Sequence, residues 1–205
     1  MKNKEKLIVG VLAVQGDFAE HIAILKKIGV ETREVRLPKD LDGVDAVIIP
    51  GGESTTLRKL FDLYGLTDAV TRVAKKGTPI WGTCAGMIML ADRLTDDRPE
   101  PLHLMDITVT RNAFGRQVDS FEADIDFPKV GKKPFRAVFI RAPAIDKVEE
   151  GVEILGKLSD GSPVALQQGN LLVTSFHPEL TEDTRFHKFF LSLVKPANGR
   201  NRYKD

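Results

Sequence analysis

The feature that most constrains this chain is a regular alternation of short apolar runs and helical segments over its first 94 residues. The run at residues 7–14 is apolar throughout and stops at Gly16, as expected for a strand that is covered on both faces. In the segment that follows, Phe18, Ile22 and Leu25 recur at helical spacing. Strands that alternate with helices in this way form a parallel sheet with helices on both faces.

The same reasoning predicts the remaining elements. In the first half, strands are expected at 32–37, 44–49 and 79–82, and helices at 54–64, 67–76 and 85–94. After residue 98, strands are expected at 107–110, 120–126, 137–140, 152–158, 164–168 and 171–176, with a last helix at 181–194. A hairpin turn at Gly169-Asn170 joins the last two strands. The predicted fold is therefore α/β, a three-layer sandwich with a mainly parallel central sheet and additional antiparallel strands in the C-terminal half.

Size and composition limit the class of protein. A chain of 205 residues that is 42% hydrophobic and 29% charged fits a single domain over residues 1–205, with an ordered core at about 7–194. The net charge of +1 gives no basic excess of the kind that nucleic-acid binding requires. No apolar stretch approaches the roughly 20 residues that cross a bilayer. The single cysteine, Cys84, favours a reducing, cytoplasmic location.

Cys84 lies in the sequence Gly82-Thr83-Cys84-Ala85-Gly86, where a predicted strand ends and a predicted helix begins. This is the pattern of a nucleophile elbow with sulfur in place of oxygen. Glycines permit the strained backbone of such a turn, and a helix N-terminus favours the reactive thiolate. A buried structural cysteine is the alternative. The flanking glycines favour the nucleophile.

A thiolate nucleophile needs a general base, and the base needs a group that orients it. His177 follows the predicted strand at 171–176 and precedes Pro178-Glu179. Side chains two residues apart in an extended segment point the same way, so Glu179 could reach one imidazole nitrogen while the other faces Cys84. A loop histidine with Glu179 complementing a helix dipole is the alternative, and spacing alone leaves both open. The other three histidines are predicted to be packed or solvated rather than catalytic: His21, His103 and His187.

A glycine-rich loop, Pro50-Gly51-Gly52-Glu53-Ser54, follows a predicted parallel strand. Its backbone N–H groups could hold a phosphate, or an oxyanion beside a nucleophile. The lysine of a phosphate-binding loop is absent, which weakens the phosphate interpretation. A tight turn with Ser54 as the helix cap is the alternative.

Together these motifs resemble the class I, or triad, glutamine amidotransferase family, whose marks are a Gly-x-Cys-x-Gly elbow, an upstream Pro-Gly-Gly loop and a distal His-Pro-Glu. The resemblance runs over about residues 7–194 and is most detailed to the branch that forms the glutaminase subunits of pyridoxal 5′-phosphate synthases. It implies a flavodoxin-like fold. The segments that carry it are 10–16, 20–21, 50–56, 82–86, 111–117, 119–122, 139–143 and 175–181.

The resemblance implies roles for individual residues. Cys84 would attack the side-chain amide carbon of glutamine, His177 would transfer the proton, and Glu179 would orient His177. Backbone N–H groups of Gly52 and Ala85 would stabilise the oxyanion. The positions that match the family's glutamine-binding residues are Gly52, Glu53, Ser54, Arg111, Ile140 and Arg141. A surface cation is the alternative for Arg111.

The resemblance also implies L-glutamine as substrate, and a synthase subunit that receives the ammonia in a hetero-oligomeric complex. Docking is expected to reorient Gly51 and Gly52. No cofactor, nucleic acid or membrane partner is expected, and the scattered histidines suggest no metal site.

Two other functions stay open. One is the glutaminase subunit of another class I amidotransferase, against which segments 52–54 and 111–117 argue. The other is a non-catalytic regulatory protein with a reactive cysteine, against which His177-Pro178-Glu179 argues.

Overall fold

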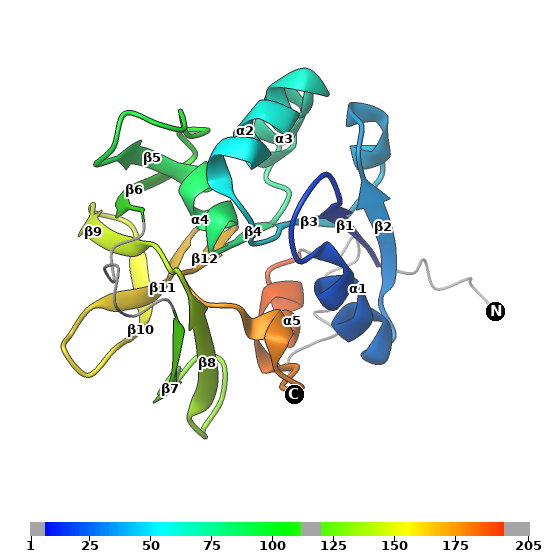
Figure 1. The fold of residues 1–205 in the computed structure, drawn as a ribbon. Helices are drawn as coiled ribbons and strands as arrows, with labels where there is room; N and C mark the ends of the chain where they lie inside the picture. The colour runs from blue at the N-terminus through cyan, green and yellow to red at the C-terminus, as the bar shows by residue number, and fades with distance from the viewer. Residues whose placement is uncertain (1–6, 112–119, 195–205) are drawn as a thin grey trace.

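The computed structural model describes residues 7–111 and 120–194, and its largest sheet has seven strands (Figure 1). Their spatial order is β10 (Glu153–Lys157), β11 (Pro163–Gln168), β12 (Leu171–Thr174), β4 (Ile80–Thr83), β3 (Ala46–Ile49), β1 (Ile8–Leu12) and β2 (Glu31–Val35). The five strands from β12 to β2 are parallel to one another. Strand β11 pairs antiparallel with β12, and β10 pairs antiparallel with β11. The predicted α/β fold is confirmed, as is the hairpin at 169–170 that joins β11 to β12.

Helices cover both faces of this sheet, because the central strands bury every side chain. All four residues of β3 and of β4 are buried. Helices α2 (Ser54–Leu63), α3 (Leu66–Lys75) and α4 (Ala85–Leu90) contribute to the core cluster on one face. Helices α1 (Phe18–Lys27) and α5 (Arg185–Ser192) contribute to the cluster on the other face (Figure 1). Two one-turn helices complete the set: η1 (Pro38–Leu41) and η2 (Pro178–Leu180).

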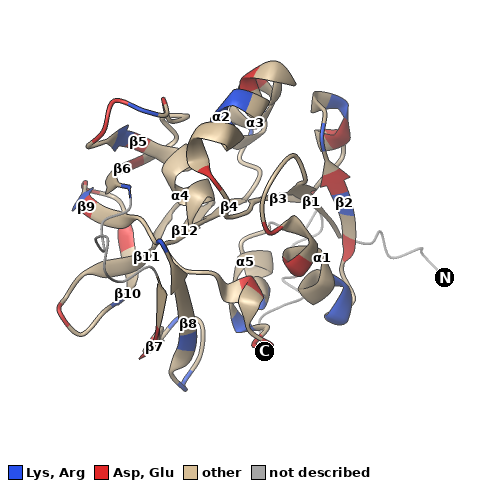
Figure 2. Cartoon of the chain, in the orientation of Figure 1, with Lys and Arg blue, Asp and Glu red and all other residues tan. Residues whose placement is uncertain are grey.

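Two smaller sheets flank the β10 side of the main sheet (Figure 1). One contains β5 (Ala91–Leu94), β6 (Met105–Thr110) and β9 (Ala144–Val148), and the other pairs β7 (Ser120–Ile125) with β8 (Phe135–Ile140). Basic and acidic residues are interspersed along the chain, as the colours of Figure 2 show, in keeping with the balanced net charge. Within residues 7–111 and 120–194, no helix is long and apolar enough to span a bilayer.

Two predicted helices were longer than the observed ones, and strands β5 and β9 were not predicted. The helix predicted at 85–94 ends at Leu90, because residues 91–94 pair with β6 as strand β5. The edge strand β9 was not predicted, since its consecutive exposed residues Asp146 and Lys147 interrupt the apolar pattern. The helix predicted at 181–194 begins at Arg185, whose backbone N–H is accepted by the Asp183 carboxylate at 2.9 Å.

The carboxyl ends of four adjacent parallel strands carry the motifs singled out in the sequence. Strand β1 leads to Gln15-Gly16, β3 to the glycine-rich loop, β4 to Cys84, and β12 to His177. Open α/β sheets bind ligands at this edge. The sheet order therefore brings together segments that are far apart along the chain.

Candidate active site

Cys84 occupies a strained turn between β4 and α4. Its backbone has φ +47° and ψ −105°, a conformation that costs free energy for any residue with a Cβ. Its N–H donates to the carbonyl of Thr174 in β12 at 2.8 Å, which fixes the turn to the neighbouring strand. The Cys84 side chain is nearly buried, and its Sγ lies 3.9 Å from the carbonyl oxygen of Ile140. The predicted elbow geometry is confirmed.

The glycine that follows Cys84 lets α4 pack tightly against the sheet. A Cβ at Gly86 would lie 2.0 Å from the carbonyl oxygen of Ile49, at the end of β3. No larger residue fits there without moving the backbone of β3 or α4. The elbow glycine is therefore explained by close approach, as expected from the sequence.

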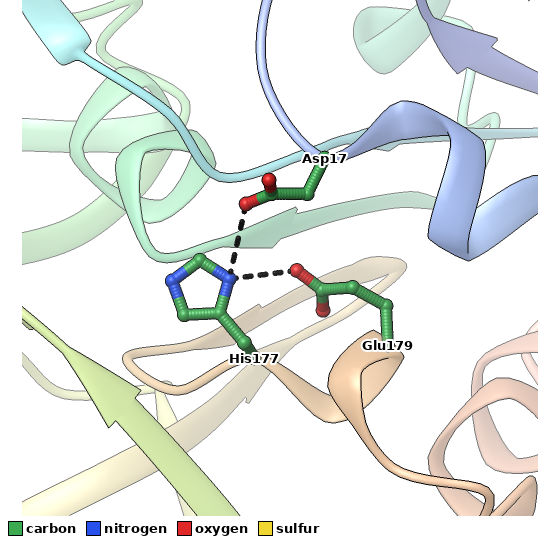
Figure 3. A group of neighbouring side chains, drawn as sticks. All are labelled: Asp17, His177 and Glu179. Atoms are coloured by element: carbon green, nitrogen blue, oxygen red, sulfur yellow. Dashed lines mark hydrogen bonds and ion pairs between the residues drawn. The ribbon is translucent and has the colours of Figure 1, made fainter. Parts of the chain in front are cut away.

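His177 and Glu179 form the hydrogen bond that the sequence predicts. The Nδ1 of His177 lies 2.7 Å from Oε1 of Glu179 (Figure 3). The intervening residues adopt the one-turn helix η2 rather than an extended chain, and the two side chains still meet. The backbone N–H of His177 donates to Val138 in β8 at 2.8 Å, which holds the ring in place. Glu179 thus contacts the imidazole itself and does not serve only a helix dipole.

The electrostatics of this group favour a proton on His177. Burial alone would lower the pKa of His177, but interactions with the side chains of Cys84 and Glu179 outweigh it and raise the pKa to about 10. Burial raises the pKa of Glu179, while its hydrogen bond with His177 opposes that rise. His177 is therefore placed to carry a proton between the Cys84 sulfur and a bound group.

A second carboxylate, not identified from the sequence, lies beside His177. Oδ2 of Asp17 lies 3.4 Å from His177 Nδ1, so both carboxylates face the same ring nitrogen (Figure 3). Asp17 occupies the N-cap position of α1, but its side chain does not cap that helix. The sequence feature that could have identified Asp17 is its position directly after Gln15-Gly16, at the sheet edge where ligands bind.

The glycine-rich loop packs directly against this group. A Cβ at Gly51 would lie 2.4 Å from Cε1 of His177. The carbonyl of Gly51 accepts the N–H of Asp17 at 3.3 Å, and Gln15 Oε1 accepts the N–H of Glu53 at 3.2 Å. The loop is therefore held by the segment that follows β1, with Gly52 between its two anchored residues.

Glu53, not Ser54, caps helix α2, which corrects the alternative considered from the sequence. The Glu53 carboxylate accepts the N–H groups of Thr55 and Thr56 at 3.0 and 2.6 Å, and it reaches both because its backbone is extended. Partial burial alone would raise the pKa of Glu53, but these hydrogen bonds lower it to about 2. Ser54 is the first residue of α2 and is buried.

The remaining predicted residues lie at the rim of the site. Arg111 donates to the carbonyl of Arg98 at 2.6 Å, and its Nη2 lies 3.7 Å from Glu53 Oε1, so it is anchored rather than a free surface cation. Ile140 approaches Cys84 through its carbonyl. Arg141 is exposed and has φ +42°. Ala85 begins α4, where backbone N–H groups have no partner within the helix. Residues 112–117 and 119 of the predicted motifs lie outside the described residues.

Comparisons with known proteins agree with this arrangement. The model of the SNO glutamine amidotransferase family matches residues 11–195. A protein from Herpetosiphon aurantiacus named pyridoxal 5′-phosphate synthase subunit PdxT is 57% identical over 190 residues, which is 91% of this chain and 100% of that protein. The protein of the same name from Dehalococcoides mccartyi is 54% identical over 189 residues, which is 91% of this chain and 97% of that protein.

Solved structures give the same picture of the fold. One described as a glutamine amidotransferase superposes with a TM-score of 0.85 at 49% identity, covering 91% of this chain and 98% of that one. The PurLQS structure from Thermotoga maritima superposes with a TM-score of 0.70 at 16% identity, covering 93% of this chain and 100% of that one, which shows a shared fold only.

Proposed function

Because this chain belongs to the SNO glutamine amidotransferase family, we propose that it is the glutaminase subunit of a pyridoxal 5′-phosphate synthase. It hydrolyses L-glutamine to L-glutamate and ammonia, and the ammonia serves pyridoxal 5′-phosphate biosynthesis. The observation that carries this function is the identity of 50–57% to relatives of that name over nearly the whole chain. The same identity disfavours a subunit of another class I amidotransferase. The oriented His177 disfavours a non-catalytic protein.

The proposed chemistry follows from the order of contacts at Cys84. The thiol proton of Cys84 passes to His177, and the resulting sulfur anion attacks the side-chain amide carbon of glutamine. His177 then protonates the departing nitrogen, so ammonia leaves and a glutamyl thioester remains. Water, deprotonated by His177, hydrolyses the thioester to glutamate. Nδ1 of His177 is held by Glu179 at 2.7 Å, which leaves Nε2 for these transfers.

The backbone around the nucleophile supplies the proposed oxyanion donors, the N–H groups of Gly52 and Ala85. Ala85 supports this role because its N–H is at the start of α4. In the proposed complex Gly51 and Gly52 reorient, which requires the hydrogen bond from Asp17 N–H to the Gly51 carbonyl to break. Activity that depends on the partner prevents wasted glutamine.

Glutamine is proposed to bind at the rim. Arg111 and Arg141 are suited to pair with its carboxylate, since a guanidinium group can form two parallel hydrogen bonds with one. The Glu53 carboxylate is occupied by the cap of α2, so its contribution to substrate binding is to hold the loop. Gly52, Ser54 and Ile140 would contribute from the loop and from the strand beside Cys84.

The wider setting is proposed on the same basis. The chain acts as one domain with its core at about 7–194, in the cytoplasm, in a hetero-oligomeric complex with a synthase subunit that receives the ammonia. The lone cysteine supports the reducing compartment. The balanced charge supports a partner that is neither nucleic acid nor membrane.

The decisive experiment measures ammonia release from glutamine, with and without a purified pyridoxal 5′-phosphate synthase subunit. We expect release that rises when the synthase is added and is lost in Cys84→Ala. Release by Cys84→Ala would remove Cys84 as the nucleophile. Absence of release under every condition would count against the glutaminase function.

A further inference from the structure

A buried row of polar side chains continues inward from Glu179. We call it the histidine row: His21 on α1, His187 on α5, and Thr83 at the end of β4. All three side chains are fully buried. Histidine has only an intermediate tendency to be buried, so two buried histidines in contact call for an explanation. Both rings also pack edge-on against Trp81, with centroids 5.5 and 5.0 Å away. The sequence predicts packed or solvated histidines at these positions, and it gives no sign that they adjoin the site.

The histidine row contacts the far side of the Glu179 carboxylate. Oε1 of Glu179 is taken by His177, and Oε2 lies 3.3 Å from Nε2 of His21. Among the described residues, Oε2 of Glu179 has no partner with good hydrogen-bond geometry. The ring nitrogen of His21 is nevertheless a polar group close to it, at 3.3 Å. The same His21 nitrogen lies 3.3 Å from the Thr83 hydroxyl. Contacts of this kind are often loose in a free enzyme and tighten during catalysis.

Only one placement of protons suits all of these contacts. With a proton on Nε2, His21 offers a donor to Oε2, and its Nδ1 accepts from Nε2–H of His187 at 3.0 Å. Nδ1 of His187, which has no hydrogen-bond partner among the described residues, then carries a lone pair and no proton. The opposite placement would point a His21 lone pair at a carboxylate and leave a buried N–H of His187 unpaired, which is costly.

We propose that His21 is a positioning residue for the reaction: its Nε2–H holds the Glu179 carboxylate ionised and oriented toward His177, and His187 fixes the proton on that nitrogen. The proposal rests on the proposed function for the role of His177. A donor to a buried carboxylate stabilises its charged form, and the charged form in turn favours a proton on His177. Two groups from the start of α1 thus act on this pair: His21 contacts Glu179, and Asp17 contacts His177.

The protonation states of the histidine row agree with this assignment. Burial, and then the neighbouring His187 and His177, hold the pKa of His21 well below its usual value. Burial lowers the pKa of His187 to about 3. Both rings are therefore neutral at physiological pH, and each carries one proton that is placed by its hydrogen bonds. The titratable groups that face the pair of His177 and Glu179 are Cys84, Asp17 and His21.

The first test needs no variant. Nitrogen-15 chemical shifts of the imidazole rings, measured on the full-length chain, report which nitrogen of each histidine carries the proton. The proposal requires a protonated Nε2 and an unprotonated Nδ1 on both His21 and His187. A proton on Nδ1 of His21 would overturn it.

The second test compares two side chains of similar length at position 21. His21→Gln keeps an N–H donor near the Nε2 position, whereas His21→Met has none, and both lose the packing of the ring on Trp81. The readout is the pKa of His177 by NMR titration of the isolated chain. We expect His21→Met to lower it by roughly one unit, since a hydrogen bond to a charged group has that order of effect, and His21→Gln to stay close to wild type.

An equal pKa of His177 in the two variants would overturn the proposal, because a purely structural role for the ring would affect both alike. The titration uses no glutamine and no synthase, so a failure of the proposed glutaminase function leaves this result readable. If His21→Met does not fold, the wild-type nitrogen shifts decide the matter.

Discussion

The site has a buried part and a rim, and the two are built in different ways. Cys84, His177 and Glu179 are almost fully buried, at 6%, 4% and 5% exposure, and each is fixed by a neighbouring strand or by a buried partner. At the rim, the side chains of Arg111 and Glu53 are 20% and 48% exposed, and the ion pair between them spans 3.7 Å. The same kinds of charged group therefore work in two different surroundings.

That difference decides which contacts carry free energy. In the buried part, low dielectric strengthens every hydrogen bond and makes each lost partner costly. At the rim, solvent screens the charges, and an exposed ion pair is worth only about 0–1 kcal/mol. Cys84, His177 and Glu179 are thus already organised in the free chain, while the side chains at the rim are more exposed to solvent.

Glu179→Gln should have the largest effect, because it removes the charge behind His177 and keeps the shape. We expect kcat for ammonia release to fall at least about a hundredfold, in line with other triads whose orienting acid is replaced by an amide. Steady-state kinetics with the synthase present would measure it. A loss of less than fivefold would show that Asp17 can orient His177 alone.

Gly51→Ala should be next, because its Cβ would lie 2.4 Å from Cε1 of His177 and would displace the ring. We expect kcat to fall by roughly tenfold to a hundredfold, the cost of a small misplacement at a reacting group. Gly29→Ala is a control away from the site, with nothing within 4 Å of its Cβ. An equal loss of activity in both variants would show that the effect does not come from the contact with His177.

Arg111→Ala should act on binding rather than on the chemical step. Loss of one screened carboxylate partner is expected to raise KM up to about fivefold, which is about 1 kcal/mol, with kcat nearly unchanged. Arg136→Ala is the control, since Arg136 pairs with Glu122 and Asp124 on the β7–β8 hairpin. A fall in kcat with unchanged KM would instead show that Arg111 acts on the chemical step and not on glutamine binding.

Glu53→Ala should have the smallest effect, seen in stability. Its pKa is lowered to about 2 in the folded chain, below the value of an unfolded glutamate. The cap therefore stabilises the fold above pH of about 4.5, and its contribution is lost as the pH falls toward 2. Urea unfolding should show a loss of about 0.5–1 kcal/mol at pH 7 that shrinks below pH 4. A loss that does not change with pH would exclude the carboxylate as its source.

The sequence predicted the parts of the site that depend on local patterns. The elbow at Cys84 and the reach of Glu179 to His177 follow from neighbouring residues, and both geometries are confirmed. His21 meets His187 across 166 positions, a contact that depends on how α1 and α5 dock on the sheet. Single-sequence patterns carry no record of such docking. Strand β5 was missed for the same reason, since pairing with β6 overrides its local pattern.

Two of the groups around the pair of His177 and Glu179 come from the N-terminal end of helix α1. Asp17 stands at its start and His21 lies one turn further on, while Glu20 and Lys27 face solvent on the same helix. Both contacts come from one end of one helix, so a displacement of α1 would change both of them. Helix α1 thus links the surface of the molecule to the pair of His177 and Glu179. A displacement of α1 from its solvent-exposed side would therefore change the electrostatic surroundings of His177.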